Sequence, residues 1–377
     1  MNYETAKFLH EVAHDPSAGT ASQDLWTQIG RYTYSNFAMQ SFGFEIPSAA
    51  DPAIQYIHES GKRSIEGTLP GSHIDIFPFL QNLPLLLKPW ERSAREHFPD
   101  DLRWVCARML EVQKIQRSEN NSLLLRIMSD GKRLGTGSDN EAAFLSLQLI
   151  IGATDTSRMS TWSFLEAMMI FPDVEEEAQM EIDNLVGSRI PVWEDFERSR
   201  YFRCMMKELW RWRPPVSLGH PHTTTRDLEY KGMKIPKGSR IHLNAWAIGH
   251  DPRRHEDPDS FWPQRHMGDG TTTSQSINLT DPTKRDHFAF GAGRRTCPGV
   301  HVAERSLALA MMRIVWAFDV GISSAAKLPL NSKDYHGFMP GNPGENLPVI
   351  LTVRSEEKRK LIDDVWAASE SEKAFLR

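Results

Sequence analysis

Cys297 lies in the most distinctive stretch of the sequence, the glycine-rich segment 288–299. The three glycines of this segment allow the backbone to turn tightly and to approach a flat ligand closely. Pro298 suits the first turn of a following helix, where its missing amide costs no hydrogen bond. The Cys297 sulfur is therefore predicted to lie at the positive end of a helix, where the dipole, free amides and Arg295 favour the thiolate. Such a thiolate would be a good axial ligand for a large metal cofactor.

Five positions of this segment fill the spacing Phe-x-x-Gly-x-Arg-x-Cys-x-Gly: Phe290, Gly293, Arg295, Cys297 and Gly299. In this motif the chain resembles the cytochrome P450 family, whose haem iron is held by a cysteine thiolate. The resemblance implies that Cys297 ligates the iron of haem b, an iron protoporphyrin, and that the other four residues form the cofactor loop. It also implies that Arg295 pairs with a haem propionate.

A second match is the pair Glu208 and Arg211, which lies on one face of a helix predicted over residues 200–213. Exposed pairs of this spacing contribute only about 0.2–0.5 kcal/mol and are common. The flanking Met, Leu and Trp side chains indicate instead that the pair is buried and needs further partners. Segment 261–265 resembles the family's Phe-x-Pro-x-Arg element, which implies that Arg265 completes a network with the pair. All three residues would be structural rather than catalytic.

A third match is the polar cluster 152–157, in the middle of an apolar helix predicted over residues 140–171. Glycine costs about 1 kcal/mol in a helix interior, and Thr, Asp and Ser compete for backbone bonds, so a local opening that admits water is expected. The alternative is a polar patch satisfied by backbone and water. The resemblance implies that Asp155 and Thr156 are the family's acid–alcohol pair, with Thr156 acting on the bound oxygen and Asp155 supplying protons.

The resemblance also implies two further regions of contact. His222 would supply another propionate contact, although a His-Pro-His sequence is more often an ordinary polar loop. Residues 216–221 and the turn 336–341 would lie over the haem and contact the substrate. Trp104 and Arg108 match the Trp-x-x-x-Arg of the family's propionate-binding helix, but they come too late in the chain to be that element.

The elements that position these residues are predicted to be mostly helices. Apolar periodicity predicts helices over residues 5–13, 25–42, 54–65, 90–116, 140–171, 200–213 and 299–318, and another that begins at Pro172. The acidic run 175–177 is interpreted as the solvated start of that last helix. Short β-like runs over residues 223–247 predict an antiparallel sheet of hairpins, residues 249–287 are expected to be irregular, and a strand is predicted over 347–353. The expected fold class is mostly α with a minor antiparallel β-sheet, the cytochrome P450 fold, in a single domain 1–377 with a charged helical tail over 355–377.

Composition excludes several classes of protein. Acidic residues outnumber basic ones by 49 to 44, so a nucleic-acid partner is not expected. The three widely separated cysteines exclude a disulfide framework and a Cys-x-x-Cys zinc site, and Cys106 and Cys204 are interpreted as small buried hydrophobic residues. No apolar run reaches the length of a bilayer, so the chain is expected to have no membrane segment and to be cytoplasmic. Full-length members of the family are usually anchored to the endoplasmic reticulum and face the cytosol.

The resemblance begins part-way into the family fold. The N-terminal section of the family, which carries the anchor, a proline-rich hinge, the first strands and the propionate-binding helix, would precede Met1. Loss of this section would remove apolar burial and propionate partners together. We therefore expect the 377-residue chain to bind haem weakly or to misfold when it is made alone.

Three functions are compatible with these residues. The first is a haem-thiolate monooxygenase of fungal secondary metabolism, which takes electrons from a separate NADPH-dependent cytochrome reductase and inserts one atom of O2 into a small apolar substrate. The second is an inactive truncated fragment, or an interaction module, of such an enzyme. The third is a haem-thiolate isomerase or dehydratase, which needs no reductase. Asp155 and Thr156 argue against the third, because O2 activation is what demands a proton relay.

Overall fold

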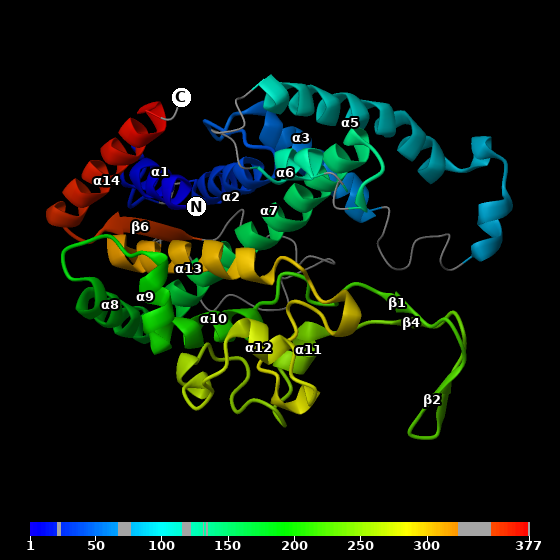
Figure 1. Cartoon of the computed structure of the whole chain (residues 1–377). Coiled ribbons are helices and arrows are strands. Elements are labelled where there is room, and N and C mark those ends of the chain that lie inside the picture. Colours follow the sequence, from blue (N-terminus) through cyan, green and yellow to red (C-terminus); the bar gives the residue numbers. More distant parts are fainter. Residues whose placement is uncertain are drawn as a thin grey trace. The chain divides into compact units, whose positions relative to one another are not determined.

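The computed structural model describes residues 1–20, 24–66, 77–114, 122–130, 132, 135–322 and 348–375. The chain divides into two compact units, and each is assembled from separate stretches of sequence. Unit 1 consists of Met1–Trp26 and Thr156–Ala368, and unit 2 consists of Thr27–Asp155 and Ser369–Arg377. Among the described helices, those that continue from one unit into the other are α2 (Leu25–Ser41), α7 (Asp139–Ile170) and α14 (Glu356–Phe375) (Figure 1).

Unit 1 carries most of the residues that the sequence analysis assigned to a site. Its other described α-helices are α1 (Asn2–Ala13), α8 (Pro172–Val186), α9 (Trp193–Arg198), α10 (Arg200–Trp212), α11 (Ala245–Gly249), α12 (Thr273–Ile277) and α13 (Val300–Ala317). Short 3-10 turns are η4 (Pro263–His266), η5 (Pro282–Lys284) and η6 (Gly293–Arg295). Helix α10 ends at Trp212 because Pro214 and Pro215 follow, and it begins where Ser199 Oγ accepts a hydrogen bond from the Phe202 amide.

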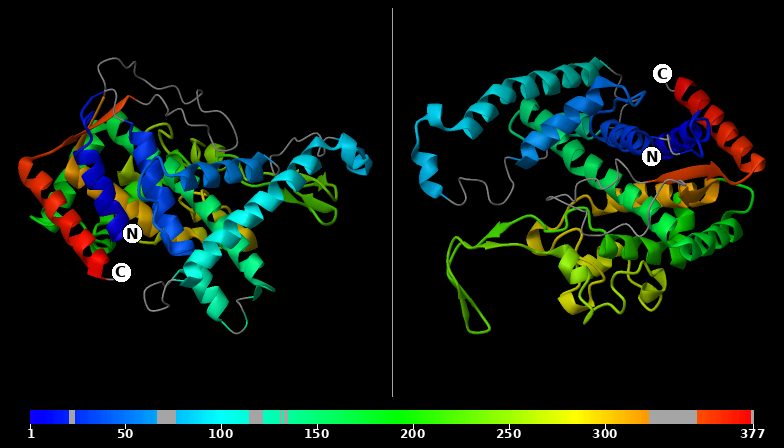
Figure 2. Two further views of the ribbon diagram at one scale, coloured as in Figure 1. Left: turned by 90° about the horizontal axis from the view of Figure 1, so that it is seen from above. Right: turned by 180° about the vertical axis from the view of Figure 1, so that it is seen from behind.

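The described strands of unit 1 form two-stranded antiparallel sheets. The pairs are β1 (His222–Thr223) with β4 (Arg240–Ile241), β2 (Leu228–Tyr230) with β3 (Met233–Ile235), and β5 (Phe318–Ile322) with β6 (Val349–Val353). Lys231 and Gly232 both have positive φ between β2 and β3, which is the conformation of a type I′ hairpin turn. Both views of Figure 2 show this hairpin extending away from the rest of unit 1.

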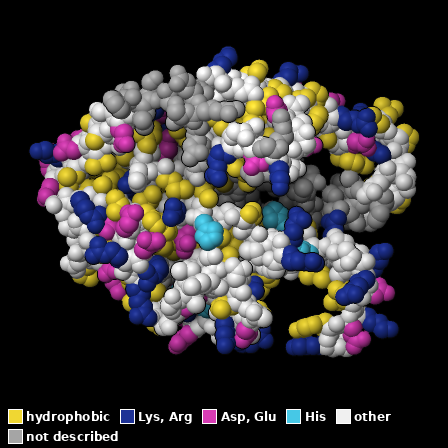
Figure 3. Space-filling view, viewed as in Figure 1, with side chains coloured by type: hydrophobic (Ala, Val, Ile, Leu, Met, Phe, Trp, Pro, Cys, Tyr) yellow, Lys and Arg dark blue, Asp and Glu magenta, His cyan; other side chains and the backbone are white. Residues whose placement is uncertain are grey.

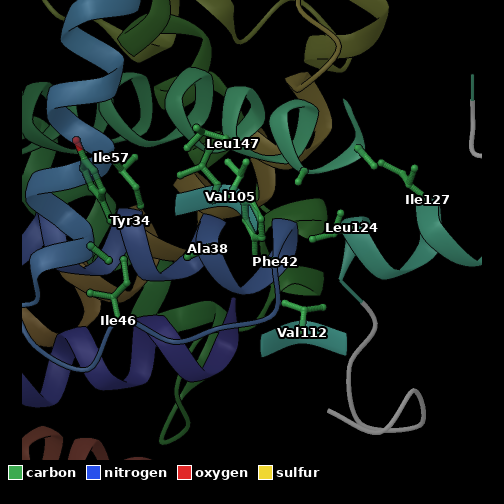
Figure 4. Close-up of a cluster of buried hydrophobic side chains, with 14 residues drawn as sticks. Tyr34, Ala38, Phe42, Ile46, Ile57, Val105, Val112, Leu124, Ile127 and Leu147 are labelled. Carbon is green, nitrogen blue, oxygen red and sulfur yellow. The ribbon is translucent and has the colours of Figure 1, made fainter. Parts of the chain in front are cut away.

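Unit 2 is built around its own apolar core. Its other described helices are α3 (Pro52–Glu66), α5 (Pro89–Lys114) and α6 (Leu123–Ser129), with 3-10 turns η1 (Pro78–Asn82) and η2 (Leu85–Leu87). Tyr34, Phe42 and Leu147 are buried together in this core, which Figure 4 shows. Trp104 stacks on Tyr56 with ring centroids 4.8 Å apart, and the Arg108 guanidinium lies 5.7 Å from the centre of the Trp104 ring. This Trp-x-x-x-Arg pair therefore packs with the core of unit 2.

The structure confirms the predicted fold class, mostly α with small antiparallel sheets. The helix predicted over residues 299–318 is confirmed as α13, Val300–Ala317, after which the chain enters β5 and pairs with β6 from Phe318↔Val353 to Ile322↔Val349. One local prediction was wrong. The segment 249–287 is not wholly irregular, since it contains η4, α12 and η5.

The surface of the described residues carries charges of both signs. On the face drawn in Figure 3, the Lys and Arg side chains are interspersed with Asp and Glu side chains. None of the helices in the described part of the chain is both long enough and apolar enough to cross a bilayer.

Glu175 corrects the interpretation of the run 175–177 as a solvated helix start. Its side chain is buried, and Oε1 accepts hydrogen bonds from the Val320 amide at 2.7 Å and from Gln179 Nε2 at 3.2 Å. Burial raises the pKa of Glu175 to about 7, against the smaller opposite effect of the Val320 hydrogen bond. The first turn of α8 therefore helps to hold β5, because its carboxyl group accepts from a strand amide.

We expect Glu175→Gln to stabilise the chain above pH 7 and to have little effect at low pH. The folded pKa lies above the ordinary value of 4.5, so the native state holds this proton more tightly than the unfolded chain does. The linked stability is present below the unfolded pKa and is lost as the pH rises through the folded pKa. Glutamine keeps an acceptor for Val320 without this loss. Urea denaturation should show a gain of about 1–3 kcal/mol at about pH 8.

The control for this change is Glu176→Gln, which alters an exposed neighbour on the same helix. It should leave the pH dependence of the unfolding free energy as it is in the unsubstituted chain. If Glu175→Gln also left that dependence unaltered, the carboxyl group would not titrate near pH 7 in the folded state.

Candidate functional site

The Cys297 loop is closed by backbone hydrogen bonds. The Cys297 amide donates to the Phe290 carbonyl at 2.9 Å, and the Thr296 amide donates to the Gly293 carbonyl at 3.2 Å. Gly291 and Gly293 have φ of +75° and +73°, a region that side chains other than glycine rarely adopt. Helix α13 begins immediately after the loop, at Val300. The sequence thus folds into a tight loop that ends at a helix start, as the glycines predicted. Pro298 does not lie in the first turn of α13, as predicted, but just before its N-cap, Gly299.

The Cys297 side chain is exposed, whereas Cys204 is buried and Cys106 is half-buried. The environment of Cys297 corrects one prediction. Removal of water by the surrounding protein raises the pKa of the Cys297 thiol, and the hydrogen bond from the Gly299 amide lowers it by less. The helix start and Arg295 are therefore not enough to stabilise the thiolate form of Cys297 in the protein without a cofactor. A bound metal cation would supply the missing positive charge, because a coordinating thiol is deprotonated.

An aromatic cluster packs the Cys297 loop against α10. The Phe290 ring packs edge-on against Trp210, with centroids 4.7 Å apart, and His287 lies 5.4 Å from the same Trp210 ring. Burial lowers the pKa of His287 to about 4, so this ring is neutral near pH 7. Its Nδ1 accepts a hydrogen bond from the Ala289 amide at 3.3 Å. Phe290 is therefore an anchor of the loop, whose position depends on α10.

The residues around Cys297 fit a haem group. Adding a Cβ at Gly291 or Gly293 would meet no atom within 4 Å, so the space beside these residues is open. The side chains of Arg295 and His222 are exposed and make no hydrogen bond or ion pair with the described residues. A cysteine sulfur is a ligand that iron accepts, and the Arg295 guanidinium and the His222 ring nitrogens can donate hydrogen bonds to the carboxylates of a porphyrin.

The structure brings Glu208, Arg211 and Arg265 together in unit 1. Glu208 Oε1 accepts from Arg211 NH2 at 2.8 Å and from Arg265 Nε at 3.0 Å, and Oε2 accepts from Arg211 Nε at 2.8 Å. Glu208 and Arg211 are fully buried. Burial by itself raises the pKa of Glu208, but hydrogen bonds from Arg211 and His266 outweigh it and hold that pKa well below its usual value. The carboxylate is thus kept charged inside the protein by its partners.

Sequence reasoning missed two parts of this network. His266 Nε2 lies 2.9 Å from Glu208 Oε2, and the Trp262 amide donates to Glu208 Oε1 at 2.8 Å. Trp262 lies inside the assigned segment 261–265 and His266 follows it, so the signal was their proximity to Arg265. A separate buried cluster was also missed, in which Lys207 Nζ lies 2.6 Å from Asp269 Oδ2 and 3.1 Å from Asp286 Oδ2. Consecutive α10 residues thus send charged side chains to two different polar clusters.

Asp155 and Thr156 are neighbours on α7, and their partners differ. Within unit 2, the Tyr34 hydroxyl donates to Asp155 Oδ1 at 2.7 Å, and His58 Nδ1 lies 3.6 Å from Asp155 Oδ2. Thr156 is half-buried, and its carbonyl accepts from Ser160 Oγ at 2.9 Å. The expected local opening of the helix is not seen, since α7 is α-helical throughout Asp139–Ile170. The polar cluster is instead accommodated within a continuous helix.

The two segments predicted to contact substrate have different outcomes. Residues 216–221 form a turn in unit 1 in which Gly219 has a φ of +62° and its amide donates to the Val216 carbonyl. The turn 336–341 lies outside the described residues.

Comparison with known proteins identifies the family. A family model described as cytochrome P450 matches residues 1–347. A cytochrome P450 monooxygenase of Gibberella fujikuroi is 51% identical over 98% of this chain and 68% of its own length. The chain belongs to the cytochrome P450 family. It is therefore a member of a family of haem-thiolate monooxygenase enzymes.

Further P450 relatives come from other fungi. The monooxygenase virE of Hypocrea virens is 35% identical over 84% of this chain and 57% of its own length, and atE of Aspergillus terreus is 33% identical over 95% and 67%. The chain thus spans between 57% and 68% of the length of these three relatives. A zebra fish cytochrome P450, determined with abiraterone, has the same fold, with a TM-score of 0.69, 21% identity, and coverage of 94% of this chain and 77% of its own.

Proposed function

We propose that this P450 is a monooxygenase of fungal secondary metabolism that inserts one atom of O2 into a small apolar molecule. The electrons would come from NADPH through a separate cytochrome reductase. The observation that carries the proposal is the exposed Cys297 residue, just before α13 in a loop that has open space beside two of its glycines. The fungal monooxygenases to which the chain is similar support the same reaction class.

Each residue of the proposed site has a task that its chemistry allows. Thiolate-ligated haem supplies the activation of O2 when it is bound, because the sulfur donates electron density that favours O–O cleavage. Cys297 holds and orients that group, and Arg295 and His222 bind its carboxylates. The Thr156 hydroxyl, on α7, would donate a hydrogen bond at the oxygen-binding site. Asp155 would then resupply the proton that is used there. The hydroxyl of Tyr34, 2.7 Å from Asp155, would keep this carboxylate oriented.

The reaction class can be tested with the haem-loaded chain, NADPH, a cytochrome reductase and O2 enriched in the heavy isotope. Mass spectrometry of a panel of small apolar compounds should show products that gain one labelled oxygen atom. Omission of NADPH should abolish them. Products that form without NADPH and O2 would indicate an isomerase or a dehydratase, and thiolate-ligated haem that consumes no NADPH with the reductase would contradict the proposal.

Thr156→Ala is expected to uncouple NADPH consumption from product formation. Without the hydroxyl, proton delivery at the oxygen site fails, and electrons leave as hydrogen peroxide. Product formed per NADPH should fall by about 100-fold, the lower end of what a positioned proton donor contributes. Thr156→Ser keeps the hydroxyl and is the matched control, which should retain most of the coupling. Equal peroxide release from both variants would remove Thr156 from the proton path.

A further inference from the structure

Two histidines and one aspartate of unit 1 meet outside the haem site. His10 and His14 come from the C-terminal end of α1, and Asp363 comes from α14, 349 residues further along the chain than His14. One ligand atom of each residue, either a ring nitrogen or a carboxylate oxygen, lies within 4.8 Å of the corresponding atoms of the other two. Figure 1 shows α1 and α14 side by side at this position.

The spacing of the two histidines is that of a metal-binding helix. Residues four apart lie on the same face, and the segment 10–14 reads His-Glu-x-x-His, a spacing whose two histidines bind zinc on helices. The spacing alone also occurs by chance. Here the fold adds a third ligand from another helix, since Asp363 Oδ1 lies 2.6 Å from His14 Nε2 and 3.7 Å from His10 Nε2.

These distances need only a small adjustment to hold an ion. Ligand atoms around tetrahedral Zn²⁺ lie about 3.3 Å apart when each is about 2.0–2.1 Å from the ion. The distance between His10 Nε2 and Asp363 Oδ1, 3.7 Å, is already close to this value. The hydrogen bond between His14 and Asp363 would open by about 0.7 Å as the ion replaces the shared proton. The three side chains are 31–42% exposed, which leaves a fourth position for water.

The packing around the cluster restricts how these rings can turn. The His10 ring stacks on Trp366, one turn along α14 from Asp363, with centroids 5.6 Å apart and planes at 29°. The Trp366 ring in turn packs against the Tyr3 ring of α1, with ring centroids 5.4 Å apart. The end of α1 is tied to α14 a second time, because Arg359 NH1 donates to the Ala13 carbonyl at 2.6 Å. Ligands held in this way lose less freedom when an ion binds.

We propose that His10, His14 and Asp363 form a binding site for Zn²⁺ that links α1 to α14. Two imidazoles and one carboxylate suit Zn²⁺ and similar transition metals rather than Mg²⁺ or Ca²⁺, which prefer oxygen ligands. The site is independent of haem, and the ion would stabilise unit 1 by joining two helices that are far apart in sequence.

Titration calorimetry with ZnCl2 on the untagged, haem-loaded chain tests the site. We expect one equivalent of Zn²⁺ to bind per chain. The midpoint of thermal unfolding of the chain should rise when Zn²⁺ is added but not when Mg²⁺ is added. His14→Ala should weaken binding by about 100-fold or more, because loss of even an outer partner of a metal ligand typically costs 10- to 100-fold. The triple variant His10→Ala, His14→Ala, Asp363→Asn should no longer bind this equivalent of Zn²⁺. Co²⁺ should give a visible absorption band that the same variant removes.

The matched control is Asp364→Asn, which makes the same change at the exposed neighbour of Asp363. It should bind Zn²⁺ as the unsubstituted chain does. Asp363→Asn, which keeps the size of the side chain, guards against misfolding and should weaken binding while leaving the circular dichroism spectrum in EDTA unchanged. Zn²⁺ binding that survives the triple variant, or that Cys297→Ser removes instead, would overturn the proposal.

Discussion

Replacing Cys297 with alanine is expected to abolish the thiolate-type spectrum of the haem-loaded chain. After reduction and addition of carbon monoxide, the red-shifted band should disappear, and NADPH-dependent product formation should fall to background. Cys297 has an exposed side chain, while Cys204 is buried in unit 1 and Cys106 belongs to unit 2, where its sulfur lies 3.4 Å from Asn140 Oδ1. Neither of these cysteines lies in the glycine loop, so we expect neither to replace the ligand.

The control for this experiment is Cys106→Ala, which removes a thiol without touching the loop. Its difference spectrum should match that of the unsubstituted chain at equal haem content. A thiolate-type band that persists in Cys297→Ala would assign the iron ligand to another residue, and the proposed function would then have to be rebuilt around that residue.

The second large effect is expected for Glu208→Ala. The substitution leaves the buried cations Arg211 and Arg265 without their shared carboxylate, and removal of one member of a buried ion pair typically costs about 3–5 kcal/mol. Glu208→Gln keeps an oxygen for the Trp262 amide and should be less damaging. Urea denaturation, followed by circular dichroism and by Trp fluorescence, measures both losses.

A surface ion pair provides the contrast for this prediction. Asp251 Oδ2 lies 2.7 Å from Arg253 NH2, but the Arg253 side chain is 87% exposed. Solvent screens such a pair, so Asp251→Asn should leave the unfolding free energy nearly unchanged. If Glu208→Ala were as mild as Asp251→Asn, the network would not hold unit 1 together.

Local patterns in the sequence predicted the parts of the site that lie close together in the chain. The loop around Cys297 depends on glycines and a proline within a few residues, and the contact of Glu208 with Arg211 depends on helical spacing. The bounds of α7 and α10 followed from periodicity and from the prolines after them. Each of these features has its physical cause within one or two turns of chain.

Contacts between distant residues could not be predicted in the same way. Tyr34 reaches Asp155 across 121 residues, and Glu175 reaches the Val320 amide across 145 residues. Periodicity reports whether a face is buried, but it does not report which polar partner meets that face. For the same reason, the pKa of Cys297 was predicted in the wrong direction, because the cost of desolvation depends on packing that the motif does not encode.

The attachment of the first helix sets the order in which unit 1 can be completed during synthesis. Helix α1 binds residues that are synthesised much later, since Asp363 follows His14 by 349 residues and Arg313, which donates to the Asn2 carbonyl, follows Asn2 by 311. At about 5–20 residues per second, the nascent α1 must wait about 20–70 s for Asp363. Its apolar side chains Phe8, Leu9 and Val12 are buried in the folded protein, where α1 contacts α13 and β6, so they stay uncovered until these later elements are made. A chaperone that binds short apolar helices would protect this segment until those later elements have been made.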